Sequence, residues 1–371
     1  MSGIGVGVIG CGVISDIYLK NAALFPQIKM RAVADLRAEV AEEKARAYGV
    51  EALTVEALLA REDIGIVLNL TIPAAHAEIG HRALAAGKHV YSEKPLAGSF
   101  DEARALNDAA QAAGLRLGCA PDTFLGGAHQ TARALVDAGE IGRPVAGTAT
   151  LMLPGHERWH PNPDFYYSEP GGGPMMDMGP YYITAMLNLL GPVARVTAFG
   201  GRSRDSREIA TGPRAGQSVP VEVDTHLAGV MEFAQGALVQ IATSFDVRAH
   251  KHGPLELYGT TGSMTLPDPN RFDGTVELHR DGAWQPQQMR HGHGDGNYRG
   301  LGLAQMAGAI ASGGPHCASG DLALHALEVM EAMHRSAREG RAIEMTTRCE
   351  RPAPLLAERG TGEIALQEEV A

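Results

Sequence analysis

A short apolar segment that leads straight into a glycine-rich turn is the feature that most constrains the fold of this 371-residue chain. Residues Ile4–Ile9 form a predicted buried strand, and Gly10, Gly12 and the small residue Ser15 follow it before a predicted helix over residues 13–24. A strand, a GxGxxS turn and a helix in this order are typical of the start of a dinucleotide-binding α/β domain. The first glycine permits the tight turn, the second leaves room for a pyrophosphate, and the small third residue lets the helix pack on the strand.

The strand–helix alternation continues through the first 120 residues. Further apolar segments predict strands at residues 30–35, 64–71, 89–92 and 115–119, with helices between them. The segment 64–71 is almost continuously apolar, as expected for a parallel strand covered on both faces. Residues 1–121 are therefore predicted to form an α/β, doubly wound NAD(P)-binding Rossmann domain.

After Pro121 the pattern changes to longer segments with period-two alternation. The predicted strands cover residues 145–153, 221–233, 237–245 and 255–258, and the predicted helices cover 178–190, 302–311 and 322–339. Residues 122–346 are expected to form a substrate-binding and oligomerisation α+β domain on an open, mainly antiparallel sheet. Residues 347–371, rich in proline and charge, are expected to be a peripheral tail.

Charge and cysteine content exclude several classes of protein. The net charge of −11 disfavours nucleic acid and anionic membranes as partners, because both need a concentrated basic surface. Four cysteines without a CxxC pair predict neither a disulfide framework nor a zinc site, which fits a reducing compartment. Histidine pairs at 250/252 and 291/293 lack Cys or Glu partners at zinc-like spacing, so no metal is predicted. Without a leader or membrane span in the sequence, a cytoplasmic protein is expected.

Asp35 bears on the choice of cofactor. It ends the second predicted strand, where a carboxylate can bind the adenosine ribose hydroxyls and repel a 2′-phosphate, which favours NAD. Arg37 could instead neutralise Asp35 and admit NADP, so both cofactors stay open. Val13 and Ile14, in the turn before the first helix, are predicted to contact the cofactor together with the glycines.

A lysine follows the short strand at residues 89–92, within the sequence Glu93-Lys94-Pro95. Ligands of open α/β sheets bind at the carboxyl ends of the strands. Lys94 is thus placed to hydrogen-bond a reacting hydroxyl or to stabilise its alkoxide, whereas most lysines are merely solvated surface residues.

Four motifs together resemble the Gfo/Idh/MocA oxidoreductase family, which includes glucose–fructose oxidoreductase and inositol dehydrogenase. They are residues 7–15, Thr71-Ile72-Pro73 with His76, Glu93-Lys94-Pro95, and the glycine-rich segment 171–179 that contains Asp177. The resemblance covers most of the chain. It implies an NAD(P)-dependent enzyme that transfers a hydride between the nicotinamide cofactor and a hydroxyl or keto group of a sugar, glycoside or polyol.

The resemblance also implies roles for single residues. Lys94 is expected to contact the reacting hydroxyl and Asp177 to orient the substrate, while Thr71, Pro73, His76 and Glu93 are expected near the cofactor. The family usually has a histidine four residues after the aspartate, but this chain has Tyr181 there.

Two residues could therefore carry the catalytic proton. Tyr181 is favoured because it occupies the position in the motif, and a phenol beside a lysine ammonium can relay a proton. His160 is the alternative, since histidine suits general acid–base chemistry. Trp159, His160 and Asn162 belong to an aromatic segment, 159–167, that suits a sugar ring or, alternatively, an oligomer interface.

Two other functions remain open at this point. Bound NAD⁺ can serve transient oxidation in a glycoside hydrolase, or the chain can be a non-catalytic nicotinamide-binding regulator. A homodimer or homotetramer is expected, with the open sheet as the contact face.

Overall fold

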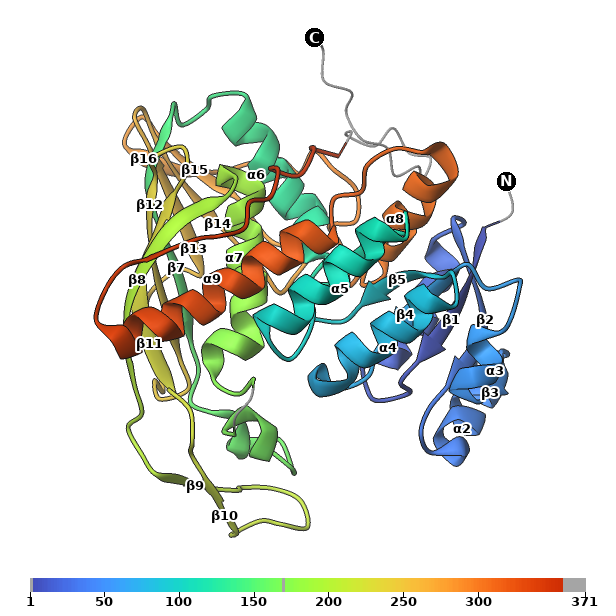
Figure 1. Cartoon of the computed structure of the whole chain (residues 1–371). Coiled ribbons are helices and arrows are strands. Elements are labelled where there is room, and N and C mark those ends of the chain that lie inside the picture. The colour runs from blue at the N-terminus through green and yellow to red at the C-terminus, as the bar shows by residue number, and fades with distance from the viewer. Residues whose placement is uncertain (1–2, 169–170, 356–371) are drawn as a thin grey trace. The chain divides into compact units, whose positions relative to one another are not determined.

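The computed structural model describes residues 3–168 and 171–355 of the chain (Figure 1). The chain divides into two compact units. The first comprises Met1–Gly126, His291–Leu324 and Pro352–Ala371, and the second comprises Gly127–Arg290 and His325–Arg351. The first unit is therefore assembled from segments that are far apart in the sequence.

Within the described residues, the first unit contains a six-stranded sheet whose strand pairs are all parallel (Figure 1). In sheet order the strands are β3 (Glu51–Leu53), β2 (Ile28–Ala34), β1 (Ile4–Ile9), β4 (Ile66–Asn69), β5 (His89–Ser92) and β6 (Leu117–Cys119). β4 is buried along its whole length, which explains its unbroken apolar sequence. The predicted Rossmann domain is confirmed.

Helices from both ends of the chain belong to this unit. They are α1 (Ser15–Asn21), α2 (Ala38–Tyr48), α3 (Val55–Leu59), α4 (Pro73–Ala85), α5 (Phe100–Ala112) and α8 (Leu301–Ser312), with the short 3-10 turns η1 (Ala22–Leu24) and η2 (Thr123–Leu125). The buried Asp122 carboxylate accepts hydrogen bonds from the backbone N–H groups of Gly300 (2.9 Å) and Gly302 (3.0 Å), at the start of α8. α8 packs against β6 and β2, so residues beyond 290 complete the first unit.

The described part of the second unit contains a nine-stranded sheet that is antiparallel except for one pair (Figure 1). In sheet order the strands are β16 (Ala283–Pro286), β15 (Glu277–Arg280), β14 (Ser263–Leu266), β13 (Leu255–Gly259), β7 (Pro144–Met152), β12 (Leu238–Ser244), β11 (His226–Phe233), β8 (Val193–Gly201) and β17 (Ile343–Glu344). β7 and β12 run parallel to each other. The predicted α+β class, built on a mainly antiparallel sheet, is confirmed.

One face of this sheet is covered by α7 (Pro174–Leu190), which packs against β7, β11 and β12. The remaining elements of the unit are α6 (Gly127–Asp137), η3 (His156–Arg158), η4 (Asp164–Tyr166), α9 (Gly320–Glu339, which begins in the first unit) and a small two-stranded ribbon of β9 (Ser206–Glu208) and β10 (Ser218–Pro220). Burial alternates along β12, as its period-two sequence predicts.

The segment expected to be a tail lies partly outside the described residues, because the structure describes it only to residue 355. Where it begins, the backbone and hydroxyl groups of Thr347 and of the preceding Thr346 donate four hydrogen bonds to the Glu328 carboxylate. Among the helices of the described residues, none is both long and apolar enough to span a membrane.

Candidate functional site

The glycine turn between β1 and α1 has the geometry of a dinucleotide cradle. Gly10 has a φ of 99°, and a Cβ atom added there would lie 2.6 Å from the carbonyl oxygen of Leu70, so only glycine fits. A Cβ at Gly12 would meet nothing within 4 Å. Ser15 is buried and its hydroxyl donates to the Gly12 carbonyl oxygen (2.6 Å). The turn therefore leaves open space above Gly12, where the sequence predicts the pyrophosphate.

Three large apolar side chains stand exposed beside this turn. Val13, Leu36 and Ile72 have relative exposures of 93%, 99% and 69%. They follow the carboxyl ends of β1, β2 and β4, which are neighbours in the sheet. Exposed apolar side chains gathered at one edge are typical of a ligand site, and these suit the flat rings of a dinucleotide.

The Asp35 carboxylate is held in place at the end of β2. Its two oxygens accept hydrogen bonds from the backbone N–H groups of Cys11 (2.9 Å) and Arg37 (3.0 Å). The Arg37 side chain is 69% exposed and its Nε lies 3.9 Å from the carboxylate, so it neutralises Asp35 only weakly. Burial, followed by the charge of Asp35, raises the pKa of Cys11 to about 11, so the thiol stays neutral. A fixed carboxylate here suits a free ribose hydroxyl better than a 2′-phosphate.

Glu93 connects the first helix to the backbone of Lys94. One carboxylate oxygen accepts a hydrogen bond from the Tyr18 hydroxyl (2.8 Å), and the other accepts one from the Lys94 backbone N–H (2.9 Å). Tyr18 is buried within α1, and this burial raises its pKa well above its ordinary value, so it remains a proton donor. Glu93 thus fixes the backbone that carries the Lys94 side chain. Sequence reasoning did not find Tyr18.

His76 holds the segment after Lys94 to the end of β4. Its Nδ1 lies 2.7 Å from the Pro95 carbonyl oxygen, and its Nε2 lies 3.0 Å from the Thr71 carbonyl oxygen. Burial lowers the pKa of His76, although the two carbonyls act in the opposite direction. The Thr71 hydroxyl donates to Asn69 Oδ1 (2.7 Å), and Pro73 is the first residue of α4. The expected residues of the first unit therefore all lie at the carboxyl ends of adjacent strands.

Asp177 lies in the first turn of α7 in the second unit. The preceding Gly173 has a φ of 90°, and a Cβ there would lie 2.9 Å from the Asp224 carbonyl oxygen, which explains the glycine. The Asp177 backbone N–H donates to the Gly173 carbonyl oxygen (3.1 Å). Tyr181 follows one helical turn later, on the same face of α7 as Asp177, and is 8% exposed.

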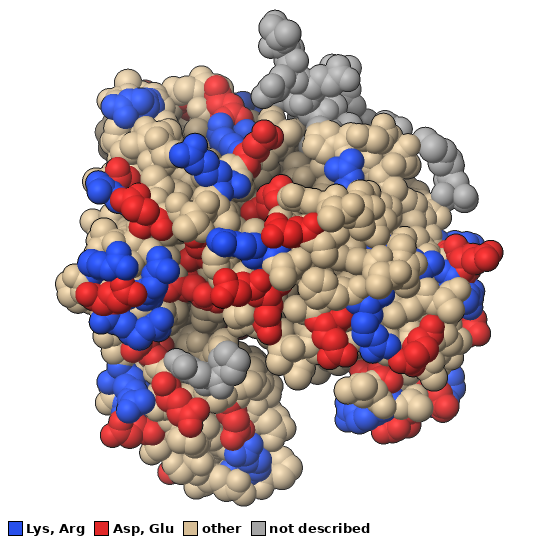
Figure 2. Space-filling view, in the orientation of Figure 1, with Lys and Arg blue, Asp and Glu red and all other residues tan. Residues whose placement is uncertain are grey.

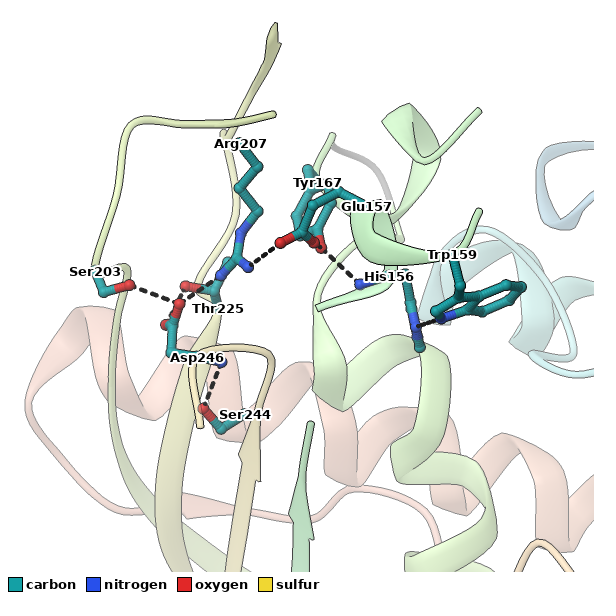
Figure 3. Close-up of polar contacts among 9 residues, drawn as sticks. All are labelled: His156, Glu157, Trp159, Tyr167, Ser203, Arg207, Thr225, Ser244 and Asp246. Atoms are coloured by element: carbon teal, nitrogen blue, oxygen red, sulfur yellow. Dashed lines mark hydrogen bonds and ion pairs between the residues drawn. The ribbon is translucent and has the colours of Figure 1, made fainter. Parts of the chain in front are cut away.

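The histidine that contacts Asp177 is His156, which sequence reasoning missed. Its Nε2 lies 3.0 Å from Asp177 Oδ2, and its Nδ1 accepts a hydrogen bond from the Trp159 indole N–H (3.1 Å; Figure 3). Because an indole N–H can only donate, Nδ1 carries no proton in this arrangement. The neutral imidazole therefore holds its proton on Nε2 and donates it to the Asp177 carboxylate.

His160, the histidine proposed from the sequence, has different neighbours. Its Nδ1 accepts a hydrogen bond from the Asn162 backbone N–H (3.1 Å), and its ring packs edge-on against Trp159 and Phe165 at centroid distances of 5.3 and 5.4 Å. Trp159 and Phe165 are 58% and 55% exposed, as aromatic surfaces that bind sugar rings are. Their contact with substrate, and that of Asn162, stays a prediction.

His156 had no local signal in the sequence. It precedes Asp177 by 21 residues, and no residue spacing distinguishes it from the other histidines. The nearest hint is Trp159 three residues later, which becomes informative only when the 3-10 turn η3 brings the two rings together.

Acidic and basic side chains are interspersed on the face drawn in Figure 2. The blue Lys and Arg side chains there lie beside red Asp and Glu side chains. Among the described residues, ion pairs such as that between Arg61 and Glu51 are common. Such pairing suits a small neutral ligand better than a polyanion.

Two family models match the chain. "Oxidoreductase family, NAD-binding Rossmann fold" matches residues 4–120, and "GFO/IDH/MocA C-terminal domain" matches residues 129–265. Together they cover most of both units.

Named relatives agree with these models. Levoglucosan dehydrogenase from Pseudarthrobacter phenanthrenivorans is 26% identical over 76% of this chain and 78% of its own length. A dTDP-3,4-didehydro-2,6-dideoxy-alpha-D-glucose 3-reductase from Actinomadura kijaniata is 32% identical over 62% of this chain and 69% of its own. The solved structure of levoglucosan dehydrogenase with NADH and L-sorbose superposes with a TM-score of 0.80 at 23% identity, covering 94% of this chain and all of that one.

The fold, the nucleotide cradle and the matches thus agree with the resemblance drawn from the motifs, and the chain belongs to the Gfo/Idh/MocA family as an NAD(P)-dependent oxidoreductase.

Proposed function

We propose that this enzyme interconverts a hydroxyl and a keto group on a sugar, glycoside or polyol, with NAD as the preferred cofactor. The relatives named as levoglucosan dehydrogenase, 1,5-anhydro-D-fructose reductase and D-xylose 1-dehydrogenase support the substrate class. The backbone-held Asp35 supports NAD. When bound, the cofactor supplies the nicotinamide that accepts or gives two electrons with a proton.

In the first unit, Lys94 is the proposed catalytic residue. Its ammonium holds the reacting oxygen and stabilises negative charge on it. Its backbone is fixed by Glu93 and the following residue by His76, so little reorientation is needed at the moment of reaction. Glu93, Thr71, Pro73 and His76 shape the cofactor side of this site.

In the second unit, Asp177 is the proposed substrate-orienting residue, and its contact with His156 is the observation that carries the proposal. The donated Nε2–H binds one carboxylate oxygen and holds the group in one orientation. Held in this way in the first turn of α7, the carboxylate is proposed to orient the substrate through a hydrogen bond from a sugar hydroxyl. Within this proposal His156 orients Asp177, because its Nδ1 already accepts from Trp159.

Tyr181 remains the proposed proton relay. The Nδ1 atoms of His156 and His160 both already accept a hydrogen bond, so neither histidine can take a proton without losing a contact. Tyr181 shares a helix face with Asp177, which supports its action on the same substrate.

The test is a panel of sugars, polyols and glycosides with NAD⁺ and NADP⁺, followed by variants on the best substrate. We expect Lys94→Ala and Tyr181→Phe each to lower kcat by about 10²-fold or more while NADH affinity is retained. Tyr182→Phe is the matched control, because Tyr182 directly follows Tyr181 in α7 and so points about 100° away from it around the helix axis. Equal losses in Tyr181→Phe and Tyr182→Phe would overturn the relay. Release of sugar from a glycoside without NADH accumulation would indicate the hydrolase, and tight NADH binding without any turnover would indicate a regulator.

We also propose that the protein is a cytoplasmic homo-oligomer, a dimer or tetramer. Phe199, Leu238 and Trp284 on the nine-stranded sheet are 79%, 49% and 43% exposed, which supports a contact face there. Light scattering measures the assembly, and cell fractionation measures the location.

A further inference from the structure

A buried ionic chain lies beside the loop that carries the Asp177 contact (Figure 3). At its centre is Arg207 of β9, whose side chain is 2% exposed. One Nη atom donates to Glu157 Oε1 (3.1 Å) and the other donates to Asp246. The hydroxyls of Ser203 and Thr225 also donate to Asp246, each at 2.6 Å. Although burial raises the pKa of Asp246, these donors outweigh it and the pKa lies below the ordinary value, so the carboxylate stays charged.

The ionic chain is linked from Glu157 to the backbone of His156 through the phenol of Tyr167. The hydroxyl of Tyr167 donates to Glu157 Oε2 and accepts a hydrogen bond from the His156 backbone N–H (3.0 Å; Figure 3). Tyr167 is fully buried, and burial followed by the contact with Glu157 raises its pKa, so it keeps its proton. Its ring faces the Arg207 guanidinium at 4.9 Å. One oxygen atom thus joins the ionic chain to the loop.

Residues next to the ionic chain also fix the orientation of the His156 imidazole ring. The ring lies 4.6 Å from the ring of the fully buried Phe245, which directly precedes Asp246 in the sequence. The other side of the loop is held by the Ala210 backbone N–H, which donates to the Glu157 carbonyl oxygen (2.9 Å). Backbone and ring of His156 are therefore both placed by residues that belong to, or adjoin, the ionic chain.

Stability alone is a weak reason for such an arrangement. Buried ion pairs are often no more stabilising than apolar residues of the same size, whereas they hold side chains in one geometry. A histidine that must place one N–H on a carboxylate needs that geometry, because hydrogen-bond strength falls steeply with misalignment.

We infer that Tyr167 and Arg207 are positioning residues for the reaction, which they influence through His156 and so through Asp177. This inference rests on the proposed role of the His156–Asp177 pair. Neither residue is proposed to touch substrate or cofactor.

The test is a double-mutant cycle on Tyr167→Phe and His156→Gln in the full-length enzyme. Tyr167→Phe removes only the shared oxygen and keeps the ring in the core. We expect kcat to fall about tenfold or more while the Kd for NADH changes less than twofold. In the His156→Gln background the same change should lower kcat less than twofold further, because its effect passes through the missing imidazole. Independent, multiplicative losses would overturn the inference.

Matched and supporting variants make the result interpretable. Tyr258→Phe is the control, since the Tyr258 hydroxyl donates to the Glu256 carboxylate (2.8 Å) in the same unit but away from the ionic chain. We expect its kcat to stay within twofold of the wild type. Arg207→Lys keeps the charge but cannot bind Glu157 and Asp246 with two separate Nη atoms. It should therefore lower kcat as Tyr167→Phe does, and it tests the inference independently should Tyr167→Phe fold poorly. An active Arg207→Lys enzyme with unchanged kcat would contradict the inference.

A fluorescence measurement follows the loop directly. The chain contains two tryptophans, so Trp284→Phe leaves Trp159 as the only reporter beside His156. Tyr167→Phe should shift the Trp159 emission and Tyr258→Phe should not. If Tyr167→Phe lowers kcat while His156→Gln and Asp177→Asn leave it unchanged, the proposed pair has no role and the inference fails with it. If the pair matters and Tyr167→Phe has no effect, the inference alone fails.

Discussion

Replacing Gly12 by alanine separates cofactor binding from folding. An added Cβ would meet no protein atom within 4 Å, and the backbone there is not in the left-handed region. We therefore expect the free energy of unfolding to stay within about 0.5 kcal/mol of the wild type. The methyl group would, however, project into the space predicted for the pyrophosphate. We expect the Kd for NAD⁺ to rise about 30-fold, which corresponds to about 2 kcal/mol.

Gly10→Ala should show the opposite pattern in the same turn. Its Cβ would lie 2.6 Å from the Leu70 carbonyl oxygen and 2.7 Å from the Thr71 nitrogen, at a φ of 99°. Backbone strain and overpacking together should cost about 3 kcal/mol and lower Tm by about 5–10 °C. Gly201→Ala is the control, because a Cβ there also meets nothing within 4 Å but lies on β8.

Calorimetric titration with NAD⁺ and thermal unfolding followed by circular dichroism measure the two effects separately. Wild-type NAD⁺ affinity in Gly12→Ala would show that the cofactor does not cross this turn. A large fall in Tm for Gly12→Ala would show that the space above the glycine is not open. Either result refutes the reasoning from the turn geometry.

Three further predictions concern the first unit. Asp35→Ser removes the charge that repels a 2′-phosphate. Measured with one sugar substrate, the ratio of kcat/KM for NADP⁺ to kcat/KM for NAD⁺ should rise at least about tenfold, and an unchanged ratio would contradict this. Tyr18→Phe should lower the free energy of unfolding by about 2 kcal/mol in denaturant titrations, since a buried hydrogen bond to the Glu93 carboxylate is lost; a loss below about 0.5 kcal/mol would argue against it. Burial raises the pKa of Asp122 to about 6, although hydrogen bonds from the start of α8 act in the opposite direction. The folded state thus holds the Asp122 proton more tightly than the unfolded chain does. The protonated carboxyl stabilises the fold fully below about pH 4, and this stabilisation is lost as the pH rises through 6. It amounts to about 1.4 kcal/mol for each pKa unit between the folded and unfolded states. Asp122→Asn should remove that slope from unfolding curves measured between pH 4 and 7.

The architecture could be predicted because local patterns specify it. The continuous apolar sequence of β4 and the alternating sequence of β12 each indicate one kind of sheet. Very short elements gave no such pattern. β3 has three residues and β17 has two, and both are formed by pairing with a neighbouring strand rather than by their own sequence.

The candidate site could be predicted only where a motif carries it. Lys94 and Asp177 stand in recognisable motifs, and their proposed roles await the kinetic tests above. His156 and Arg207 do not, since their partners are 21 and 50 residues away in the sequence. Contacts of this range depend on where the second unit's loops and ribbon meet, which residue spacing does not encode.

The return of residues 291–324 to the first unit has a consequence for how the protein is made and dissected. Asn21 donates to the carbonyl oxygens of Asn297 and Arg299, Gly118 bridges to Ser319, and Asp122 caps α8, so each tie needs chain that is synthesised late. A fragment ending near residue 126 lacks these ties and exposes the apolar surface that α8 covers. On the ribosome, the amino-terminal third of the chain must wait for more than two thirds of the polypeptide to emerge before the first unit can be completed.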